Sequence, residues 1–444
     1  MFSKILIANR GEIAVRLIRA CREMGVSTVA VYSEADRDAL HVHLADESVC
    51  IGPAPAKDSY LNMKAVLSAA MVTGAQAVHP GYGLLSENAR FARLCAACGL
   101  CFIGPPADVI SRMGDKDAAR RTMKAAGVPV IPGSEKLESI EEAGKAALEV
   151  GYPLLIKASA GGGGRGIRLV TGPDQLERQF NAASQEALSA FGCGDVYIEK
   201  YLRPVKHIEV QVLCDKHGSH VALGERDCSV QRRNQKLLEE SPSPGISEAL
   251  RQELISCSVR AAKAVGYENA GTIEYLLDRD NNFYFMEMNT RLQVEHPVTE
   301  MVTGIDLVKW QLRIAAGQPL NFTQEDVRIS GCAIECRINA EDPARGNMPC
   351  AGKVTLLHAP GGPWVRLDTA LYQDYVVPPF YDSMIAKLIV HAKTREEALR
   401  KMQAALGELV IEGVAHNSEL QMELLQDERF VAGSYTTDFM SKWG

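Results

Sequence analysis

One short segment carries polar side chains at every second position. It reads Glu-Met-Asn-Thr-Arg-Leu-Gln-Val-Glu from residue 287 to residue 295. Alternate side chains of an extended strand share one face, so five polar groups would lie together. They are Glu287, Asn289, Arg291, Gln293 and Glu295. These residue types indicate a site for a metal ion and a small oxyanion. Oxygen ligands suit a hard cation, and the planar guanidinium of arginine suits the anion. A glutamate beside the anion could take the proton of that anion.

Glu274 is expected on the strand before that segment. The turn Asp-Arg-Asp-Asn-Asn separates two expected strands, 271–277 and 283–289. In a hairpin centred on this turn, Glu274 falls opposite or nearly opposite Glu287. Like charges across a ladder repel, and Mg²⁺, which binds one or two carboxylates plus phosphate oxygens, would remove the repulsion. Two solvated glutamates on an exposed face remain the alternative.

A glycine-rich run, Gly-Gly-Gly-Gly-Arg-Gly at 161–166, lies between two expected strands, 154–158 and 167–170. Its backbone N–H groups could fold over phosphates. It is not a P-loop, because no Gly-Lys-Ser/Thr follows and no helix begins there. A hairpin tip needs one or two glycines rather than five in six, which favours a moving phosphate lid over a merely flexible turn. Lys157 and Lys116 could place ammonium groups on those phosphates, although a single lysine is more often a surface charge.

Alternating strands and helices are expected to carry the N-terminal part of the chain. Residues 4–8 and 28–32 are apolar strand-like runs, and the apolar residues between them recur at helical spacing. This alternation, continuing to about residue 112, predicts a parallel sheet covered by helices. The first turn, Asn-Arg-Gly-Glu, lacks the G-x-G-x-x-G of dinucleotide-binding oxidoreductases, which argues against that class.

The remaining elements are expected to form mixed and antiparallel pairs. Helices are predicted near 115–126, 139–150, 247–265 and 394–408, and strands at 154–158, 167–170, 196–200, 207–213, 219–223, 271–277 and 283–289. Several short strands follow residue 331. The fold class is therefore α/β.

Composition limits the remaining choices. The chain has 444 residues, of which 46% are hydrophobic and 23% charged, and its net charge is −7. No nucleic-acid partner is expected, because the basic residues are scattered, and no membrane partner, because no apolar run approaches the roughly 20 residues that span a bilayer. The N-terminus does not resemble a signal peptide, so a cytoplasmic location is expected.

Three cysteines stand at CxxCxxC spacing, Cys95, Cys98 and Cys101. Such spacing occurs in iron–sulfur proteins. We expect core packing instead, because Cys95 and Cys98 would lie on the apolar side of a helix, Cys101 would open the next strand, and no fourth cysteine is near.

Eight segments resemble the biotin carboxylase subunit of acetyl-CoA carboxylase, an ATP-grasp enzyme, along nearly the whole chain. They are KILIANRGEIAVR (4–16), HPGYGLLSEN (79–88), MGDK (113–116), GGGGRG (161–166), ERDCSVQRRNQK (225–236), EMNTRLQVEHPVTEM (287–301), ECRINAEDP (335–343) and YDSMIAK (381–387). The resemblance implies a Rossmann-like N-terminal domain (1–112), an ATP-grasp domain (113–330) with a mobile lid at about 130–203, and a C-terminal α+β domain (331–444).

The resemblance also implies roles for individual residues. The nucleotide-binding set is Lys116, Lys157, Gly161, Gly162, Gly163, Gly164, Glu199, Lys200, Leu202, His207, Gln231 and Asn234, with residues 199–202 as the hinge that reads adenine. Magnesium, or Mn²⁺ in its place, would be held by Glu274, Glu287 and Asn289. Bicarbonate would be gripped by Arg291, Gln293, Val294 and Lys236 and deprotonated by Glu295. Arg337 would stabilise the biotin enolate, with Tyr82 beside the biotin ring.

The implied reaction is ATP- and bicarbonate-dependent carboxylation of biotin through carboxyphosphate. The sequence lacks a lysine between two methionines, the mark of a biotinyl domain, so the biotin should sit on a partner, the biotin carboxyl carrier protein. Carboxyltransferase subunits and a homodimer are further expected partners, with fatty acid synthesis as the setting.

Asn234, Ala160, Ala386 and the loop 345–352 depart from the usual pattern. The alternatives are an ATP-grasp ligase for another carboxylic acid, the corresponding subunit of a different acyl-CoA carboxylase, and a non-enzymatic ATP-binding subunit.

Overall fold

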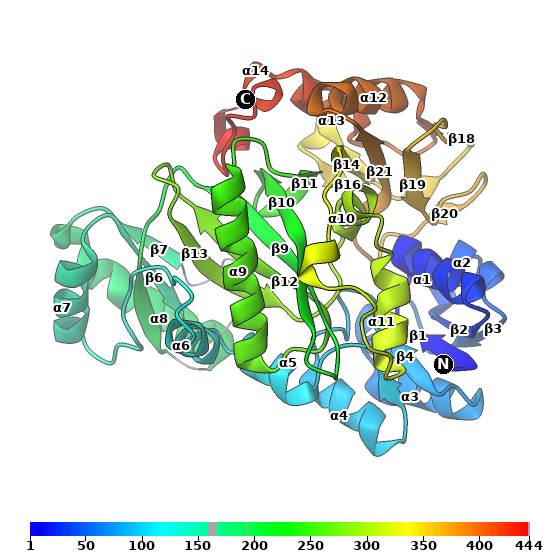
Figure 1. Cartoon of the computed structure of the whole chain (residues 1–444), viewed down its shortest axis with the longest axis horizontal. Coiled ribbons are helices and arrows are strands. Elements are labelled where there is room, and N and C mark those ends of the chain that lie inside the picture. Colours follow the sequence, from blue (N-terminus) through cyan, green and yellow to red (C-terminus); the bar gives the residue numbers. More distant parts are fainter. Residues whose placement is uncertain (159–166, 193, 443–444) are drawn as a thin grey trace. The chain divides into compact units, whose positions relative to one another are not determined.

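The computed structural model describes residues 1–158, 167–192 and 194–442. It divides into two compact units. The first comprises residues 1–111, 206–273 and 289–444, and the second residues 112–205 and 274–288. Figure 1 follows the chain from one end to the other. Across the described residues, none of the helices combines the length and apolar character that crossing a bilayer requires.

The N-terminal sheet of the first unit has five parallel strands in the order β3-β2-β1-β4-β5. Its elements are β1 (Lys4–Ile7), α1 (Gly11–Glu23), β2 (Ser27–Tyr32), α2 (Leu40–Leu44), β3 (Glu47–Cys50), α3 (Met63–Val72), β4 (Ala77–His79), α4 (Ala89–Ala97) and β5 (Cys101–Phe102). Ile5, Leu6 and Ile7 are inaccessible to solvent, as expected for a parallel strand covered on both faces. The predicted parallel sheet is confirmed.

The cysteines near this sheet follow the packing interpretation only in part. Cys95 lies on α4 and is buried in an apolar cluster, whereas Cys98 caps the same helix and is exposed. Burial raises the pKa of the Cys95 thiol to about 12, so it stays protonated as a small apolar group. The expectation that Cys98 also packs inward was wrong, because α4 ends at Ala97 and no longer directs the next side chain to the core.

The largest sheet has eight strands in the order β13-β12-β9-β10-β11-β14-β21-β19. Its strands are β9 (Lys206–Cys214), β10 (His220–Arg232), β11 (Gln235–Ser241), β12 (Asn269–Leu277), β13 (Phe283–Asn289), β14 (Cys332–Asn339), β19 (Val365–Thr369) and β21 (Met384–Ala392). β12 passes from the first unit to the second after Ile273. The pairs from β9 to β19 are antiparallel.

Helices cover both faces of this sheet in the first unit. They are α9 (Glu248–Val265), α10 (His296–Thr303), α11 (Leu307–Ala315), α12 (Arg395–Glu408), α13 (Ser418–Gln426) and α14 (Glu428–Val431). Figure 1 shows α9 running along β9 and β10. α12 packs on the apolar face of β14 and β21, where Leu388 meets Met402, and α10 packs on the opposite face against Ile389. The predicted α12 is confirmed, and it begins at the N-cap Thr394, whose hydroxyl accepts from the Glu397 amide.

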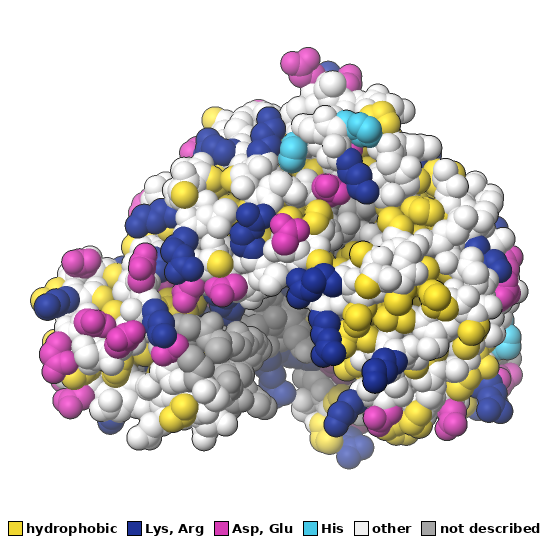
Figure 2. Space-filling model, turned by 90° about the horizontal axis from the view of Figure 1, so that it is seen from below, with side chains coloured by type: hydrophobic (Ala, Val, Ile, Leu, Met, Phe, Trp, Pro, Cys, Tyr) yellow, Lys and Arg dark blue, Asp and Glu magenta, His cyan; other side chains and the backbone are white. Residues whose placement is uncertain are grey.

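Short strands complete the C-terminal part. They are β15 (Glu341–Asp342), β16 (Met348–Pro349), β17 (Gly352–Lys353), β18 (Leu356–His358), β20 (Val376–Val377) and β22 (Val410–Glu412). They pair antiparallel as β15–β16, β17–β20 and β18–β22. The face in Figure 2 carries both basic and acidic side chains, and in one part of it several lysine and arginine side chains lie near one another without an acidic side chain between them.

The second unit is built on a three-stranded antiparallel sheet in the order β7-β6-β8. Its elements are α6 (Lys116–Ala125), α7 (Ile140–Val150), β6 (Leu154–Ala158), β7 (Ile167–Val170), α8 (Leu176–Phe191) and β8 (Val196–Lys200), and α5 (Ala107–Gly114) crosses its first boundary. Leu154, Ile156 and Ile198 form an apolar core with α7 and α8. The strands on either side of the glycine run are confirmed, and the run itself lies outside the described residues.

Several elements were not anticipated from the sequence, among them α10, α11 and α13. β10 continues to Arg232 instead of ending near residue 223, and β11 and α8 had no predicted counterpart. In β10 and β11 buried charges such as Arg226 and Glu239 interrupt the apolar periodicity. Such charges hide a strand from pattern analysis, because they are buried only where other parts of the chain supply partners.

Candidate active site

The segment 290–295 does not continue the strand. β13 ends at Asn289, and Glu295 is the N-cap residue of α10, with φ −81° and ψ 11°. The single extended row predicted from Glu287 to Glu295 is therefore wrong beyond Asn289. Pro297 in the first turn fixes a helical φ and favours a helix start at this point.

The loop nevertheless brings Glu295 to two cations. Lys236 Nζ donates to Glu295 Oε1 at 2.6 Å and to Gln293 Oε1 at 3.1 Å. Arg337 Nη2 donates to Glu295 Oε2 at 3.0 Å. Glu295 is 1% exposed, so both carboxylate oxygens are held by charged donors away from water. Three predicted catalytic residues, Glu295, Lys236 and Arg337, thus meet.

A second layer of charges lies behind this group. Lys236 Nζ also donates to Glu209 Oε2 at 2.6 Å, and Arg226 Nε donates to Glu209 Oε1 at 2.5 Å. Arg226 is inaccessible to solvent and donates further to Gln211, Thr299 and Thr272. Each nitrogen of this guanidinium therefore donates at least one hydrogen bond, which offsets the cost of burying its charge.

Arg337 is held from the other side by Glu239. Its Nε donates to Glu239 Oε1 at 2.6 Å. Glu239 on β11 stands opposite Glu335 on β14, and both are inaccessible to solvent. Both oxygens of Glu335 lack a hydrogen-bond partner among the residues that the structure describes. Ionising both of two adjacent buried carboxyl groups costs free energy, because the two negative charges repel each other.

The electrostatics divide these carboxyl groups into two kinds. Burial by itself would raise the pKa of Glu295, but the cations around it, Lys236 first, hold that pKa below its ordinary value. Burial raises the pKa of Glu239 to about 7, although Arg337 opposes it. Burial also raises the pKa of Glu335 well above its ordinary value, despite Lys387, and Glu239 adds to the increase. The surroundings therefore favour the ionised form of Glu295 and the protonated form of Glu335.

Arg291 lies at the entrance of the loop and contacts an acid that the sequence did not single out. Its Nε donates to Glu87 Oε2 at 2.9 Å and its Nη2 to Asn289 Oδ1 at 3.0 Å. Glu87 also accepts from the Thr290 amide at 3.0 Å. Glu87, in the loop after β4, thus orients the Arg291 side chain, which also contacts the predicted metal ligand Asn289.

Tyr82 and Val294 are joined through buried charges. The Tyr82 hydroxyl donates to Glu12, and Lys387 contacts Glu12 Oε1 at 3.2 Å. Lys387 Nζ donates to the Val294 carbonyl oxygen at 2.8 Å.

Five predicted nucleotide ligands lie in the second unit. Lys157 on β6 donates to Glu199 on β8, the neighbouring strand. Lys200 Nζ donates to the Gly151 and Tyr152 carbonyls, both at 3.2 Å, and Leu202 follows β8. Lys116 is exposed at the start of α6, whose N-cap is Asp115. Gly161 to Gly164 lie outside the described residues.

His207, Gln231 and Asn234 lie in the first unit. Gln231 Nε2 and His207 Nδ1 are 2.9 Å apart, which places the two side chains together. Asn234 is exposed in the two-residue turn between β10 and β11, where Arg233 and Asn234 both have positive φ. Asparagine tolerates this left-handed conformation.

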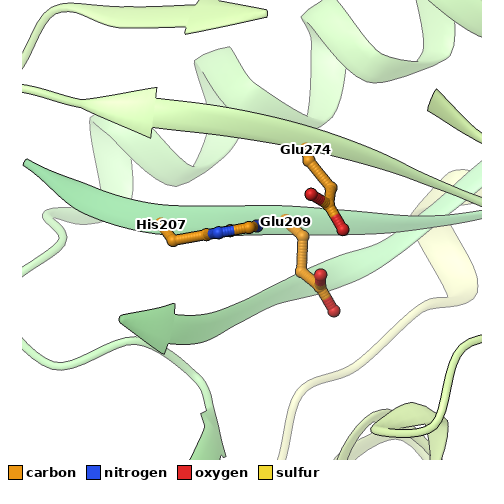
Figure 3. A group of neighbouring side chains, drawn as sticks. All are labelled: His207, Glu209 and Glu274. Atoms are coloured by element: carbon orange, nitrogen blue, oxygen red, sulfur yellow. The ribbon is translucent and has the colours of Figure 1, made fainter. Parts of the chain in front are cut away.

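The predicted metal ligands differ in exposure. Glu274 on β12 is 4% exposed and Asn289 is 7% exposed, whereas Glu287 on β13 is exposed. Figure 3 draws Glu274 together with His207 and Glu209, which stand two residues apart on β9. Mg²⁺ prefers oxygen ligands, and Glu274, Glu287 and Asn289 offer carboxylate and amide oxygens, so the predicted ligands fit that ion. Glu209, Cys228 and Glu295 also lie close together, but this cluster is a poorer metal site, because Arg226 and Lys236 already neutralise its carboxylates.

Sequence reasoning missed Glu209, Arg226, Glu239, Glu335 and Glu87. A signal was present for three of them, because Glu209, Arg226 and Glu335 stand among apolar residues in β9, β10 and β14. A charge on the buried face of a strand requires a partner. The sequence does not say which strands lie adjacent, so the partners could not be assigned.

Comparison with known proteins defines the class first. Residues 115–323 match the family model of the carbamoyl-phosphate synthase L chain ATP-binding domain. The class is therefore that of ATP-grasp ligases, which are enzymes. Residues 1–110 match the model of the biotin carboxylase N-terminal domain, and residues 335–442 that of the biotin carboxylase C-terminal domain.

Curated relatives and solved structures narrow the class. Biotin carboxylase 1 of Bacillus subtilis is 56% identical over 445 residues, covering 100% of this chain and 99% of the relative. Biotin carboxylase of Haemophilus influenzae is 55% identical, covering 100% and 99%. The chain belongs to the biotin carboxylase family. The Campylobacter jejuni biotin carboxylase complexed with β,γ-ATP superposes with a TM-score of 0.95 at 48% identity, covering 100% and 99% of the two chains. The biotin carboxylase domain dimer of Hydrogenobacter thermophilus 2-oxoglutarate carboxylase, solved with MgADP, ADP and bicarbonate, gives 0.94 at 51% identity, covering 100% and 98%.

Proposed function

We propose that this chain uses ATP and bicarbonate to carboxylate biotin on a separate carrier protein. Family membership supports the reaction class, and the names of the solved relatives supply the ligands, a nucleotide with magnesium and bicarbonate. The observation that carries the proposal is the buried carboxyl group of Glu295, which accepts hydrogen bonds from Lys236 and Arg337.

In the first step bicarbonate is the nucleophile. Arg291, Lys236, Gln293 and Val294 would hold it, and Glu295 would take its proton. A bicarbonate oxygen then bonds to the γ-phosphorus, the bond to the β,γ-bridging oxygen breaks, and carboxyphosphate and ADP form. Such phosphoryl transfer depends on positioning and charge neutralisation. The cations weaken Glu295 as a base, but a bound anion would raise its pKa again by repulsion.

The nucleotide would be held by the residues expected from the family. Lys116, Lys157 and His207 would meet phosphates and base, and residues 199–202 would read adenine. Glu274, Glu287 and Asn289 would hold Mg²⁺, which supplies neutralisation of phosphate charge. Val294, through its backbone, would contribute to the anion site rather than to the nucleotide.

The second step transfers the carboxyl group. Carboxyphosphate releases CO2 and phosphate, and the phosphate takes the proton from the biotin ureido nitrogen. That nitrogen attacks CO2, and Arg337 stabilises the enolate charge on the ureido oxygen, with Tyr82 beside the ring. Arg337 must then give up part of its contact with Glu295. This side chain would therefore contact the base of the first half-reaction and the biotin enolate of the second.

The physiological setting is the first half-reaction of acetyl-CoA carboxylase, leading to malonyl-CoA and fatty acids. The partners would be the biotin carboxyl carrier protein, carboxyltransferase subunits and a second copy of this chain. One solved relative is described as a domain dimer, which supports the last of these. Other relatives belong to 2-oxoglutarate carboxylase and pyruvate carboxylase, so a different final acceptor is the second candidate.

The deciding experiment is release of ADP from ATP, measured with and without bicarbonate and with and without free biotin. We expect release to require bicarbonate and to increase with biotin. ADP release that needs another carboxylic acid instead would assign the chain to a different ligase, and absence of any release would favour a non-enzymatic ATP-binding role.

A further inference from the structure

Lys387 is a lysine with no access to solvent. It lies on β21 between Arg337 of β14 and Asp368 of β19, its cross-strand neighbours. Its Nζ donates to the Val294 carbonyl oxygen at 2.8 Å and contacts Glu12 Oε1 at 3.2 Å and Asp368 Oδ2 at 4.0 Å. Burial of an ammonium group is costly, so a lysine is kept here for what it contacts rather than for its volume.

The Val294 carbonyl needs such a partner. It belongs to the peptide bond that enters Glu295, the N-cap residue of α10, and it lies outside both the β13 ladder and the helix. A buried backbone carbonyl without a partner costs free energy comparable to a lost hydrogen bond. The preceding Gln293 carbonyl is also held by a side chain, because it lies 2.8 Å from His296 Nδ1. Side chains from other elements thus fix the loop from Gln293 to Glu295.

The other contact of Lys387 leads to Tyr82. Glu12 is 5% exposed on α1 and accepts from the Tyr82 hydroxyl. Lys387 Nζ also lies 5.9 Å from the centroid of the Tyr82 ring. A continuous path therefore runs from Tyr82 through Glu12 and Lys387 to the peptide before Glu295.

We propose that Lys387, paired with Glu12, is the positioning residue that sets the peptide between Val294 and Glu295 for bicarbonate and ties it to Tyr82. This inference rests on the proposed function, because it assigns bicarbonate to that loop. Lys387 does not touch substrate and acts through Val294 and Glu295. Its removal shifts the base and the anion site together, and leaves the nucleotide contacts of the second unit unchanged.

The test is a kinetic comparison of three variants. Lys387→Met keeps the length of the side chain and removes the donor. A misplacement of about 1 Å at a reacting group costs on the order of 10²-fold, so kcat/KM for bicarbonate should fall by that order while KM for ATP stays within about twofold. Lys206→Met is the matched control, because Lys206 also joins a carboxylate (Asp227, 2.9 Å), a carbonyl (Gly433, 3.2 Å) and an aromatic ring (Tyr435, 4.1 Å). It should lose stability without a selective change in bicarbonate kinetics.

The third variant, Glu12→Gln with Lys387→Met, keeps the inference testable if the single variant fails to fold. It removes both charges of the buried pair, so it should fold and still show the selective loss for bicarbonate. Wild-type bicarbonate kinetics in a folded Lys387→Met or double variant would overturn the inference, as would equal losses for ATP and bicarbonate. Failure of wild-type protein to need bicarbonate would instead overturn the proposed function.

Discussion

Side chains of alternating charge form a continuous row beneath the proposed anion site. In order of contact they are Arg226, Glu209, Lys236, Glu295, Arg337 and Glu239. The row is neutral when all six groups are ionised, and Glu335, the cross-strand neighbour of Glu239, is a seventh group beside its end. A bicarbonate ion entering this row meets cations that are already partnered, so it must share Lys236 and Arg337 with Glu295. This sharing is what would return basicity to Glu295 when the anion binds.

Glu295→Gln tests the base role directly. The substitution keeps size and hydrogen bonding but removes basicity, and a positioned base contributes about 10²–10⁴-fold. We expect bicarbonate-dependent ATP cleavage to fall by that factor, and the affinity for MgADP to stay nearly unchanged. Steady-state kinetics and calorimetric titration of ADP measure the two halves. Retained turnover would remove Glu295 from the base role, and lost nucleotide affinity would mean that the loop holds the nucleotide.

Arg337→Ala should separate the two half-reactions. Lys236 still contacts Glu295 in this variant, so bicarbonate activation keeps one of its cations. The ureido oxygen of biotin loses its proposed cation. Carboxylation of free biotin should therefore fall by far more than basal bicarbonate-dependent ATP cleavage, both measured on the same preparation. An equal loss of both activities would assign Arg337 to bicarbonate activation or to general structure.

Glu335→Gln should change the pH dependence of stability. Glu335 keeps its proton in the folded chain at pH values above its ordinary pKa of 4.5, where the unfolded chain has lost it. In the wild type, the contribution of Glu335 to the free energy of unfolding is therefore largest below pH 4.5. It decreases as pH rises, by about 1.4 kcal/mol per pH unit at most. Glutamine has no such loss, so the free energy of unfolding of the variant minus that of the wild type should increase between pH 5 and pH 7.5. Urea titrations at the two pH values measure it, and a difference independent of pH would show that Glu335 is ionised.

At the scale of elements, sequence analysis succeeded where one local pattern decided the structure. The parallel N-terminal strands, α12 and the strands on either side of the glycine run were predictable, because apolar periodicity and turn residues mark them. β11 and the second half of β10 were missed, since buried charges such as Arg226 and Glu239 are stable only beside strands distant in sequence. The loop before α10 was predicted as a strand because its alternation was clear and Pro297 was given too little weight. Glu295, Lys236 and Arg337 could be named from family motifs, but Glu209 and Glu239 required the strand order.

Thr299→Val tests how α10 is fixed to the large sheet. Thr299 Oγ1 accepts from Arg226 Nη1 at 2.9 Å, and valine leaves that buried donor without this acceptor. Because Arg226 retains other partners, the free energy of unfolding should fall by about 1 kcal/mol, the lower end for such a loss. Thr303→Val is the control and should cost less, because the Thr303 hydroxyl makes local contacts, donating to the carbonyl of Thr299 and accepting from the amide of Ile305, and does not touch the large sheet through them. Urea titration compares them, and equal losses would show that the contact from Arg226 does not fix the helix.

At the scale of the whole molecule, the proposed nucleotide ligands are divided between the two compact units. Lys157 and Glu199 belong to the second unit, and His207 and Gln231 to the first. The second unit has an apolar core of its own around Leu154 and Ile198. A body with its own core can unfold locally as one cooperative element. The three-part domain division and the lid at about 130–203 remain predictions.

Nucleotide binding should therefore slow amide exchange in the second unit. If ATP uses ligands from both units, MgADP binds only when both are in place, and at about 100 times its Kd it contributes about 2.7 kcal/mol against opening. Exchange through such openings should slow by about 100-fold in β6 and β8, measured by hydrogen exchange with and without MgADP. α12 is the internal control, because it packs on the apolar face of the large sheet and carries none of the proposed nucleotide ligands. Unchanged protection in β6 and β8 at saturating nucleotide would contradict a closing role for this unit, and equal slowing in α12 would indicate general stabilisation instead.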